Sequence, residues 1–318
     1  MRELTIGKND AGARLDRFLG KALPLLPPAL AQKYIRIKRV KVNGGRAQRD
    51  QRLQEGDVLQ LYINDEFFDK PSEENMFLTL FKPRLTVVYE DEHLLLADKP
   101  QGMVVHADET EKVNTLINHI QAYLYQKREW NPRWENAFTP ALCNRIDRNT
   151  GGIVIAAKNA ETLRIINDKI RDHELTKRYL CITLGAPRPP AGEVENFLRK
   201  DEKKKQVFVF HKPVPGAKTA VTRYKTLQRR GELALVEVEL LTGRTHQIRA
   251  TMADLGCPLL GDGKYGNGEK NRGYGETRQA LYSYQLTFDL PTDAGILNYL
   301  RGRTFQVDGV PFREKYFG

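Results

Sequence analysis

Residues 142–157 read LCNRIDRNTGGIVIAA and combine a charged loop with an apolar strand. Asp147 lies between Arg145 and Arg148, and Asn149 to Gly152 are typical of a turn. The run IVIAA then predicts a buried β-strand. A carboxylate held in a loop beside cations is stabilised in its ionised form, which suits a nucleophile or a base. Taken alone, the motif is better explained by a surface aspartate in a solvated salt bridge.

A second motif, LTGRTHQIR at residues 241–249, carries a glycine turn into a predicted helix over 245–255. Arg244, His246 and Gln247 gather donors at the positive end of that helix, an arrangement that suits a phosphate group. An ordinary helix start with a solvated polar face explains these residues equally well. His246 can serve as a general base, although a lone histidine beside glutamine and arginine is more often a hydrogen-bonding group.

The third motif is Lys177-Arg178-Tyr179, directly before the apolar strand LCITLG. Tyr179 can stack on a base that has left its helix, or exchange a proton with it. In isolation, an ordinary aromatic residue at the start of a strand is the better explanation.

The elements around these motifs predict an α+β fold with a large, mainly antiparallel mixed sheet. Two strands with an acidic turn are expected in LTVVYEDEHLLLADKP (85–100), and further strands at 153–157, 179–185, 207–210, 219–227 and 233–241. Helices are expected at 115–125, at 161–171 behind Asn159 as a cap, and at 245–255. The glycine-rich stretch 261–275 is predicted to be a loop, too irregular for a phosphate-binding fingerprint.

The N-terminal part predicts a small separate domain of two helices and a β-hairpin. Leu15, Phe18 and Leu19 recur at helical spacing, and a second helix is expected after Pro27-Pro28. Alternating valines lead into the turn Asn43-Gly44-Gly45. We expect a small module over residues 1–63, an acidic linker over 64–76 and a large domain over 77–318. The resemblance described below implies that the first is an RNA-binding module and the last a catalytic domain.

Charge favours an anionic partner. Lysine and arginine total 51 against 40 acidic residues in 318, which gives a net charge of +11 and a pI near 9.4. Residues 31–52 hold eight of these cations against the single acid Asp50. Nucleic acid is therefore the favoured partner and a membrane surface the second. The predicted RNA-contacting cations are Lys33, Arg36, Lys38, Arg39 and Lys41.

Apolar runs and cysteines indicate the compartment. No run approaches the roughly 18 apolar residues of a membrane span, and the first residues lack the apolar core of a signal peptide. We expect a cytoplasmic protein. Cys143, Cys181 and Cys257 are too few and too scattered for a disulfide framework or a zinc site, so buried, reduced thiols are expected.

Together the motifs resemble the RluA-type pseudouridine synthases. The resemblance rests on DEHLLLADKPQGMVVH (91–106), NRIDRNTGG (144–152), ELTKRYLCITLG (174–185) and LTGRTHQIRATMADLGCPLLGD (241–262). RLDRFL (14–19) and VKVNGGRAQRDQRLQEGDVL (40–59) are similar to the RNA-binding module of the ribosomal-protein-S-four type. Asn144 and Gly151 depart from the histidine and serine that are usual at those positions of the family.

The resemblance implies an isomerase that converts uridine to pseudouridine in structured RNA without a cofactor or metal. It implies that Asp147 is the catalytic aspartate, that Arg249 pairs with it, that Tyr179 is the active-site tyrosine and that Arg145 helps to displace the target base. The aspartate can attack the sugar, add to the base or remove a sugar proton, and the residues do not choose among these routes.

Two of these expectations have alternatives, namely the RNA substrate and the class of protein. The N-terminal module favours ribosomal RNA over transfer RNA, by analogy with other modifiers that carry it. A non-catalytic RNA-binding or ribosome-assembly factor on the same fold is the competing class, and the presence of Asp147 argues against it. We expect a monomer.

Overall fold

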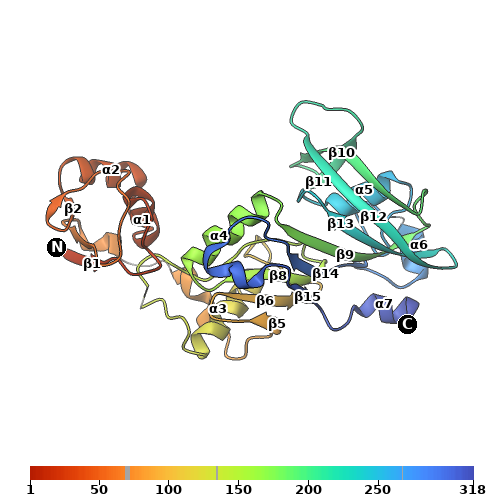
Figure 1. Cartoon of the computed structure of the whole chain (residues 1–318), viewed down its shortest axis with the longest axis horizontal. Helices are drawn as coiled ribbons and strands as arrows, with labels where there is room; N and C mark the ends of the chain where they lie inside the picture. Colours follow the sequence, from red (N-terminus) through yellow and green to blue (C-terminus); the bar gives the residue numbers. More distant parts are fainter. Residues whose placement is uncertain (69–71, 134, 267) are drawn as a thin grey trace.

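The computed structural model describes residues 1–68, 72–133, 135–266 and 268–318 (Figure 1). Two sheets organise the chain, a small four-stranded one near the N-terminus and a large eleven-stranded one in the rest. This is the predicted α+β class. Within these residues, no helix combines the length and apolar character needed to cross a bilayer.

The N-terminal sheet has the order β1-β4-β2-β3, and all its neighbours are antiparallel. Its strands are β1 (Arg2–Thr5), β2 (Val40–Val42), β3 (Gly45–Arg46) and β4 (Val58–Leu61). Helices α1 (Leu15–Ala22) and α2 (Pro28–Arg36) pack on this sheet through a shared core that includes Leu15, Phe18 and Leu59. Pro28 suits the first turn of α2 because that position has no helical N–H bond to lose. The two predicted helices and the hairpin are therefore confirmed.

Short 3-10 helices lie on either side of residues 69–71, which are outside the described part of the chain. They are η1 (Asp65–Phe68) and η2 (Ser72–Thr79). Buried Phe77 lies with its ring centroid 5.1 Å from that of Trp130 and 5.7 Å from that of Tyr125. The C-terminal end of the expected linker segment is thus followed directly by a residue packed into the large domain.

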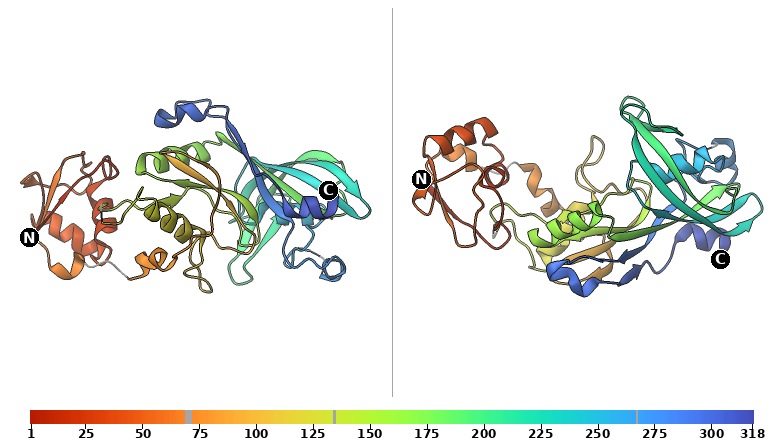
Figure 2. Two further views of the ribbon diagram at one scale, coloured as in Figure 1. Left: turned by 90° about the horizontal axis from the view of Figure 1, so that it is seen from below. Right: turned by 45° about the horizontal axis from the view of Figure 1, so that its top comes forward.

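The large sheet has the order β11-β10-β12-β13-β9-β14-β8-β6-β5, with β15 beside β14 and β7 beside β8. Among the described strands of this sheet, all neighbours are antiparallel except β8 and β14. Figures 1 and 2 show β5, β6 and β8 in the middle of the molecule and β10 to β13 toward the end opposite the N-terminal module. The strands are β5 (Thr86–Glu90), β6 (Leu94–Lys99), β7 (Ala141–Leu142), β8 (Gly151–Ala157), β9 (Leu175–Leu184), β10 (Ala191–Asp201), β11 (Gln206–Phe210), β12 (Lys218–Arg230), β13 (Leu233–Leu240), β14 (Leu281–Phe288) and β15 (Thr304–Gln306).

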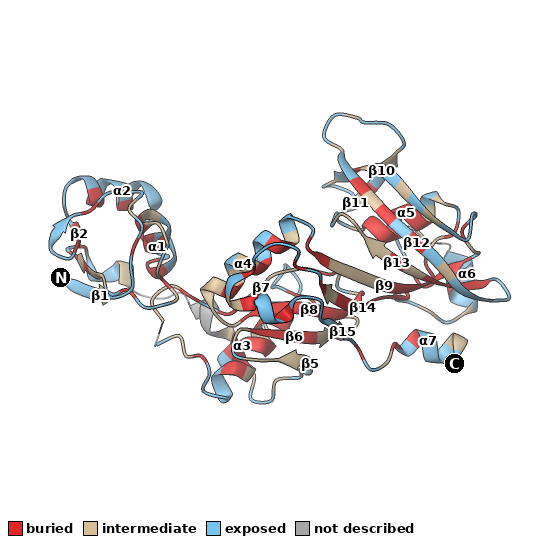
Figure 3. Cartoon of the chain, viewed as in Figure 1, coloured by how far each residue is buried: buried red, intermediate tan, exposed pale blue. Residues whose placement is uncertain are grey.

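Buried residues concentrate where β6, β8 and β14 lie side by side (Figure 3). All seven residues of β8 are buried, which explains its continuous apolar sequence. The expected buried thiols are found at Cys181 and Cys257, whereas Cys143 is partly exposed.

Helices cover the sheet between strands. α3 (Leu116–Gln126) is capped by Thr115, and α4 (Ala160–Arg171) by the predicted cap Asn159, whose side chain accepts from Thr162 N. The remaining helices are α5 (Gln247–Asp254), α6 (Gly268–Gly273), η3 (Gly295–Leu300) and α7 (Pro311–Phe317).

Two expectations need correction. α5 begins at Gln247 and not at Thr245, because His246 has φ 52° and ψ 20°, which lie in the left-handed region. The stretch 261–275 is not a plain loop, because it contains α6.

Hydrogen bonds join the N-terminal module to the large domain. Asn9 Nδ2 donates to Glu135 Oε1 at 2.9 Å, and Asn136 Nδ2 donates to Asp10 Oδ2 at 3.1 Å. Ala160 N, at the start of α4, donates to Asn9 Oδ1 at 3.1 Å. The module is therefore docked on the larger domain through polar contacts.

Candidate active site

Asp147 lies in the loop between β7 and β8, and buried groups hold that loop in place. Asn144 Oδ1 accepts from Ile155 N at 2.8 Å, which ties the loop to β8. Lys99 Nζ, fully buried at the end of β6, donates to the carbonyl oxygens of Met103 at 2.7 Å and of Arg148 and Pro100 at 3.0 Å. Asn144 thus anchors the loop although the family usually has histidine there.

Two glycines let β8 approach β14 directly after this loop. A Cβ atom on Gly151 would lie 2.2 Å from Cε2 of Tyr282, and one on Gly152 would lie 2.2 Å from the carbonyl oxygen of Ser283. Gly152 also has φ 109°, which other residues rarely adopt. The close pairing explains why glycine stands at 151 in this chain.

Arg249 connects Asp147 to a second carboxylate. Its Nη1 donates to Asp147 Oδ2 at 2.9 Å, while Nε and Nη2 donate to the two oxygens of Asp262 at 2.7 and 3.0 Å. The expected meeting of Asp147 and Arg249, 102 positions apart, is therefore present in the structure. Burial alone would lower the pKa of Arg249, but Asp262 and Asp147 together raise it above its ordinary value, so the guanidinium stays charged.

Sequence reasoning missed Asp262. Its side chain is fully buried, and its Oδ1 also accepts from the backbone N–H groups of Lys264 at 2.8 Å and Tyr265 at 3.1 Å. Burial raises the pKa of Asp262, but the hydrogen bonds and charge of Arg249 lower it below its ordinary value. The only signal was its place at the end of the motif 241–262, where a single aspartate after glycine looks like a turn residue.

Tyr179 lies on β9 between β13 and β14, opposite Val238 and Ser283. It is 6% exposed, and burial raises the pKa of its hydroxyl to about 12 despite a hydrogen bond with Ser283. The negative charge of Asp147 acts in the same direction, since the two groups lie near each other. The hydroxyl of Tyr179 is therefore protonated at neutral pH, and the side chain is an uncharged aromatic ring.

His246 completes the group around Asp147. Its Nε2 lies 3.8 Å from Asp147 Oδ2, and its Nδ1 lies 2.8 Å from the hydroxyl oxygen of Tyr265. Burial lowers the pKa of His246, although Asp147 opposes this effect, so the ring is neutral at neutral pH. Tyr265 was not singled out from the sequence because its stretch resembles a loop.

The other residues predicted to bind substrate in this region are Gln247, Arg244 and Arg145, and their surroundings differ from those of His246. Gln247 is 2% exposed, and its amide bonds to Thr242 Oγ1, Arg244 N, Val221 O and Thr222 Oγ1. All four of its hydrogen-bonding positions are used inside the protein, so the side chain holds the loop before α5 and is not free to contact RNA. Arg244 is exposed with its Nε bonded to Thr219 O, and exposed Arg145 lies close enough to His106 to lower that residue's pKa, an effect second to burial.

The predicted cations of the N-terminal module lie on α2, on β2 and between them, and these two elements are at the other end of the molecule from β10 and β11 (Figure 1). Lys33, Arg36, Lys38 and Arg39 are exposed and Lys41 is partly exposed. Two of the cations lie over aromatic rings, Arg39 over Tyr34 at 5.5 Å and Lys41 over Tyr62 at 5.4 Å. The five cations thus remain available to an external partner on a separate surface.

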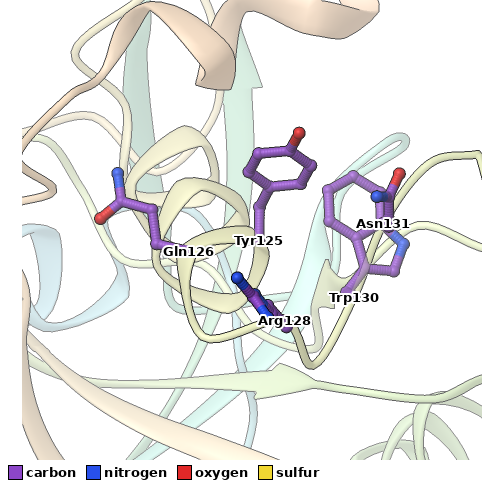
Figure 4. A pocket seen from close by; sticks show the side chains of 5 residues that line it. All are labelled: Tyr125, Gln126, Arg128, Trp130 and Asn131. Carbon is purple, nitrogen blue, oxygen red and sulfur yellow. The ribbon is translucent and has the colours of Figure 1, made fainter.

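Two cavities of the described structure are not lined by Asp147. One of about 460 Å³ is lined by residues from the end of α3 and the loop after it, namely Tyr125, Gln126, Arg128, Trp130 and Asn131 (Figure 4). A second, of about 430 Å³, lies at the junction with the N-terminal module and includes Lys21, His106 and Glu135. The paired charges, and not cavity size, identify the candidate active site.

Comparison with known proteins agrees with this organisation. Residues 93–254 match the sequence model of a family described as RNA pseudouridylate synthase, and residues 13–59 match that of the S4 domain. The chain belongs to the RNA pseudouridylate synthase family.

Relatives share most of their length with this chain. It is 33% identical over 267 residues to ribosomal large subunit pseudouridine synthase C of Rickettsia typhi, covering 80% of this chain and 83% of that protein. It is 31% identical over 238 residues to ribosomal large subunit pseudouridine synthase D of Borreliella burgdorferi, covering 72% and 70%.

A solved structure shares the fold. Human RNA pseudouridylate synthase domain containing 4 superposes with a TM-score of 0.57 at 21% identity, covering 76% of this chain and 93% of that one. The large sheet with its helices is therefore the fold of a pseudouridylate synthase, and the chain is an enzyme of the isomerase class that acts on RNA.

Proposed function

We propose that this chain isomerises specific uridines of ribosomal RNA, with Asp147 as the catalytic carboxylate. The observation that carries the proposal is the arrangement Asp147–Arg249–Asp262, in which one buried guanidinium holds two carboxylates. Asp262 is fully buried, whereas the side chain of Asp147 is 29% exposed. Asp147 is thus the carboxylate of this pair that a nucleotide can reach.

The reaction breaks the bond between N1 of uracil and C1′ of ribose, turns the base and joins C5 to C1′. The proton on C5 is lost and N1 gains one, so no atoms are added overall. The enzyme must keep an ionised carboxylate beside the sugar and retain the detached base. Arg249 would hold the carboxylate of Asp147 in a fixed direction, and Tyr179 would pack against the uracil.

Ribosomal RNA is the proposed substrate, and transfer RNA is the alternative. The relatives from Rickettsia typhi and Borreliella burgdorferi carry names that refer to the large ribosomal subunit. An activity on ribosomal RNA would be cytoplasmic in bacteria. A monomer remains our prediction for the state in solution.

The proposed division of labour follows the two sheets. Residues 1–63 would bind RNA through five cations, namely Lys33, Arg36, Lys38, Arg39 and Lys41. Residues 64–76 would connect this module to residues 77–318, which would form the catalytic domain. Arg145, Arg244 and His246 would contact the RNA near the target base. Phosphate contacts of this kind supply affinity without reading sequence.

The test of the proposed chemistry is Asp147→Asn. This change preserves the shape of the side chain and removes its charge, so pseudouridine formation should fall below detection while RNA affinity and the thermal unfolding midpoint stay close to wild type. Asp168→Asn is the matched control, because Asp168 also pairs with an arginine, Arg171, but on the exposed surface of α4. Retained turnover in Asp147→Asn would disprove its role.

The substrate is tested by mapping pseudouridine across total RNA from cells with and without the protein. Loss of one or a few sites in large-subunit ribosomal RNA is expected. Loss of sites in transfer RNA would replace the proposed substrate, and an unchanged map together with RNA binding would favour the non-catalytic class.

A further inference from the structure

Tyr265 contacts three other parts of the candidate active site. Its backbone N–H donates to Asp262 Oδ1 at 3.1 Å, and its ring lies 5.2 Å below the guanidinium carbon of Arg249. Its hydroxyl oxygen accepts from Val207 N, on edge strand β11, at 2.8 Å and lies 2.8 Å from His246 Nδ1. Tyr265 therefore links the sheet edge to the groups around Asp147.

The hydroxyl has a single proton, and its neighbours determine where that proton goes. The oxygen already accepts the N–H of Val207, so its own proton needs an acceptor. Among the described residues, His246 Nδ1 is the one acceptor within hydrogen-bonding distance of this hydroxyl. Burial raises the pKa of Tyr265, so the hydroxyl keeps its proton at neutral pH.

We propose that Tyr265 is a positioning residue that holds His246 in the tautomer protonated on Nε2, so that His246 acts as an N–H donor to an oxygen of the RNA backbone and not as a general base. The inference rests on the proposed function of the site, because it assigns one member of that site its task.

The surroundings of Nε2 support a donor role toward the substrate. The 3.8 Å separation between Nε2 and Asp147 Oδ2 is too long for a hydrogen bond, so the carboxylate does not occupy this N–H. The left-handed backbone of His246 is rare for a residue with a side chain, and such conformations gather at functional sites. The charged groups that act on the ring are Asp147, Arg249, Lys264 and Asp262. A ring with a proton on Nε2 has no lone pair there to act as a base.

Nuclear magnetic resonance of the full chain with 15N-labelled histidine tests the tautomer directly. The chain has 6 histidines, and the signals of His246 are assigned by their loss in His246→Gln. At neutral pH the wild type should show Nδ1 unprotonated and Nε2 protonated, and Tyr265→Phe should give a mixture of tautomers. A proton on Nδ1 in the wild type, or an unchanged spectrum in Tyr265→Phe, would overturn the inference. This spectrum does not depend on whether pseudouridine is formed, so it is separate from the test of the proposed function.

Turnover on ribosomal RNA from cells lacking the protein tests the donor role. Tyr265→Phe keeps the ring beneath Arg249 and should lower kcat by about tenfold with RNA affinity changed less than about twofold. Tyr123→Phe is the control, since the hydroxyl of Tyr123 donates to Glu90, which is not part of the proposed site. Glutamine has an N–H but no basic nitrogen, so His246→Gln should retain about tenfold more turnover than His246→Ala. Equal losses in the Gln and Ala variants would contradict the donor role.

Discussion

Arg249 shows why a charge alone is not enough at this site. Its three guanidinium nitrogens each have a partner, one on Asp147 and two on Asp262, and the side chain is 9% exposed. A planar fork can hold two carboxylates in fixed directions, whereas an ammonium group is a point charge on a flexible chain. The orientation of Asp147 therefore depends on the shape of Arg249 as well as on its charge.

Arg249→Lys should consequently lower turnover by about 100-fold while RNA affinity falls much less, because most affinity would come from remote phosphate contacts. Single-turnover kinetics and binding isotherms measured on the same RNA separate the two effects. Arg223→Lys is a suitable comparison, since Arg223 also bridges two carboxylates, Glu193 and Glu239, but is 52% exposed. Equal losses of turnover and affinity in Arg249→Lys would contradict the prediction.

Lys99 gives stability a pH dependence. Burial lowers the pKa of this lysine to about 7, although Asp147 and Asp98 raise it, whereas a lysine in the unfolded chain titrates near 10.5. Between these two values the unfolded chain binds a proton that the folded chain lacks. The contribution of Lys99 to the unfolding free energy is therefore lowest below pH 7 and rises by up to about 1.4 kcal/mol per pH unit from there toward pH 10.5.

Urea unfolding of the wild type and of Lys99→Met between pH 7 and 10 measures this contribution. The wild-type unfolding free energy should climb relative to that of the variant as pH increases, since other titrating groups are common to both proteins. Parallel curves would show that Lys99 does not lose its proton in this range.

The resemblance to the pseudouridine synthases implied the pairing of Asp147 with Arg249, but Asp262, Lys99 and Tyr265 were not assigned roles from sequence. Their roles depend on contacts between distant segments, such as Lys99 with the carbonyl of Arg148 and Tyr265 with Val207. A buried charge has no local pattern of its own, because its partner is supplied by the tertiary fold.

At the scale of elements, strong local signals gave the correct secondary structure. The cap Asn159, the helical pattern that begins at Thr115 and the apolar run of β8 were sufficient for α4, α3 and the central strand. β10 and β14 were not predicted. β10 has only two buried residues among its eleven and carries charges along its length, and β14 mixes polar with apolar residues although most of it is buried. Both are ordered by their neighbours in the sheet and not by alternation in their own sequence.

The pairing of β8 with β14 makes a specific prediction about Gly151. Gly151→Ser should lower the unfolding free energy by about 1–3 kcal/mol, because the added Cβ would overlap the ring of Tyr282. In a Tyr282→Ala background the same change should cost much less, which a double-mutant cycle by urea unfolding would measure. Gly20→Ser is the control, since a Cβ there meets nothing within 4 Å. Equal costs of Gly151→Ser in both backgrounds would contradict this account.

At the scale of the whole molecule, the positive charge lies in two segments. Residues 31–52 have eight cations and one acid, and residues 199–218 have seven cations and two acids. These net charges of +7 and +5 together exceed the +11 of the entire chain, so the remainder is close to neutral. The first segment was recognised from the sequence, and the second was missed because it spans a hairpin, β10 and β11, that was only half predicted.

Substituting three cations of the N-terminal segment should flatten the salt dependence of RNA binding. With Lys33, Arg36 and Lys38 changed to Gln, the slope of log affinity against log salt should fall by about 2–3, since each lost phosphate contact removes about 0.7–0.9. Fluorescence anisotropy with a stem–loop RNA measures the slope. The same change at Lys82, Arg171 and Arg301, which lie outside both basic segments, is the charge-matched control. A similar slope in the two triple variants would show that the N-terminal surface does not contact phosphate.

The polar contacts of Asn9, Asp10, Glu135 and Asn136 have a consequence for the entropy of RNA binding. A module on a free tether loses rotational and translational freedom each time it engages its ligand, and that loss weakens the complex. Here the loss occurs when the chain folds and the module docks. When RNA binds, the module and the large domain already have a fixed separation. Less entropy is therefore lost on binding, and the RNA affinity of the docked protein is higher than that of a protein with the same contacts and a free module.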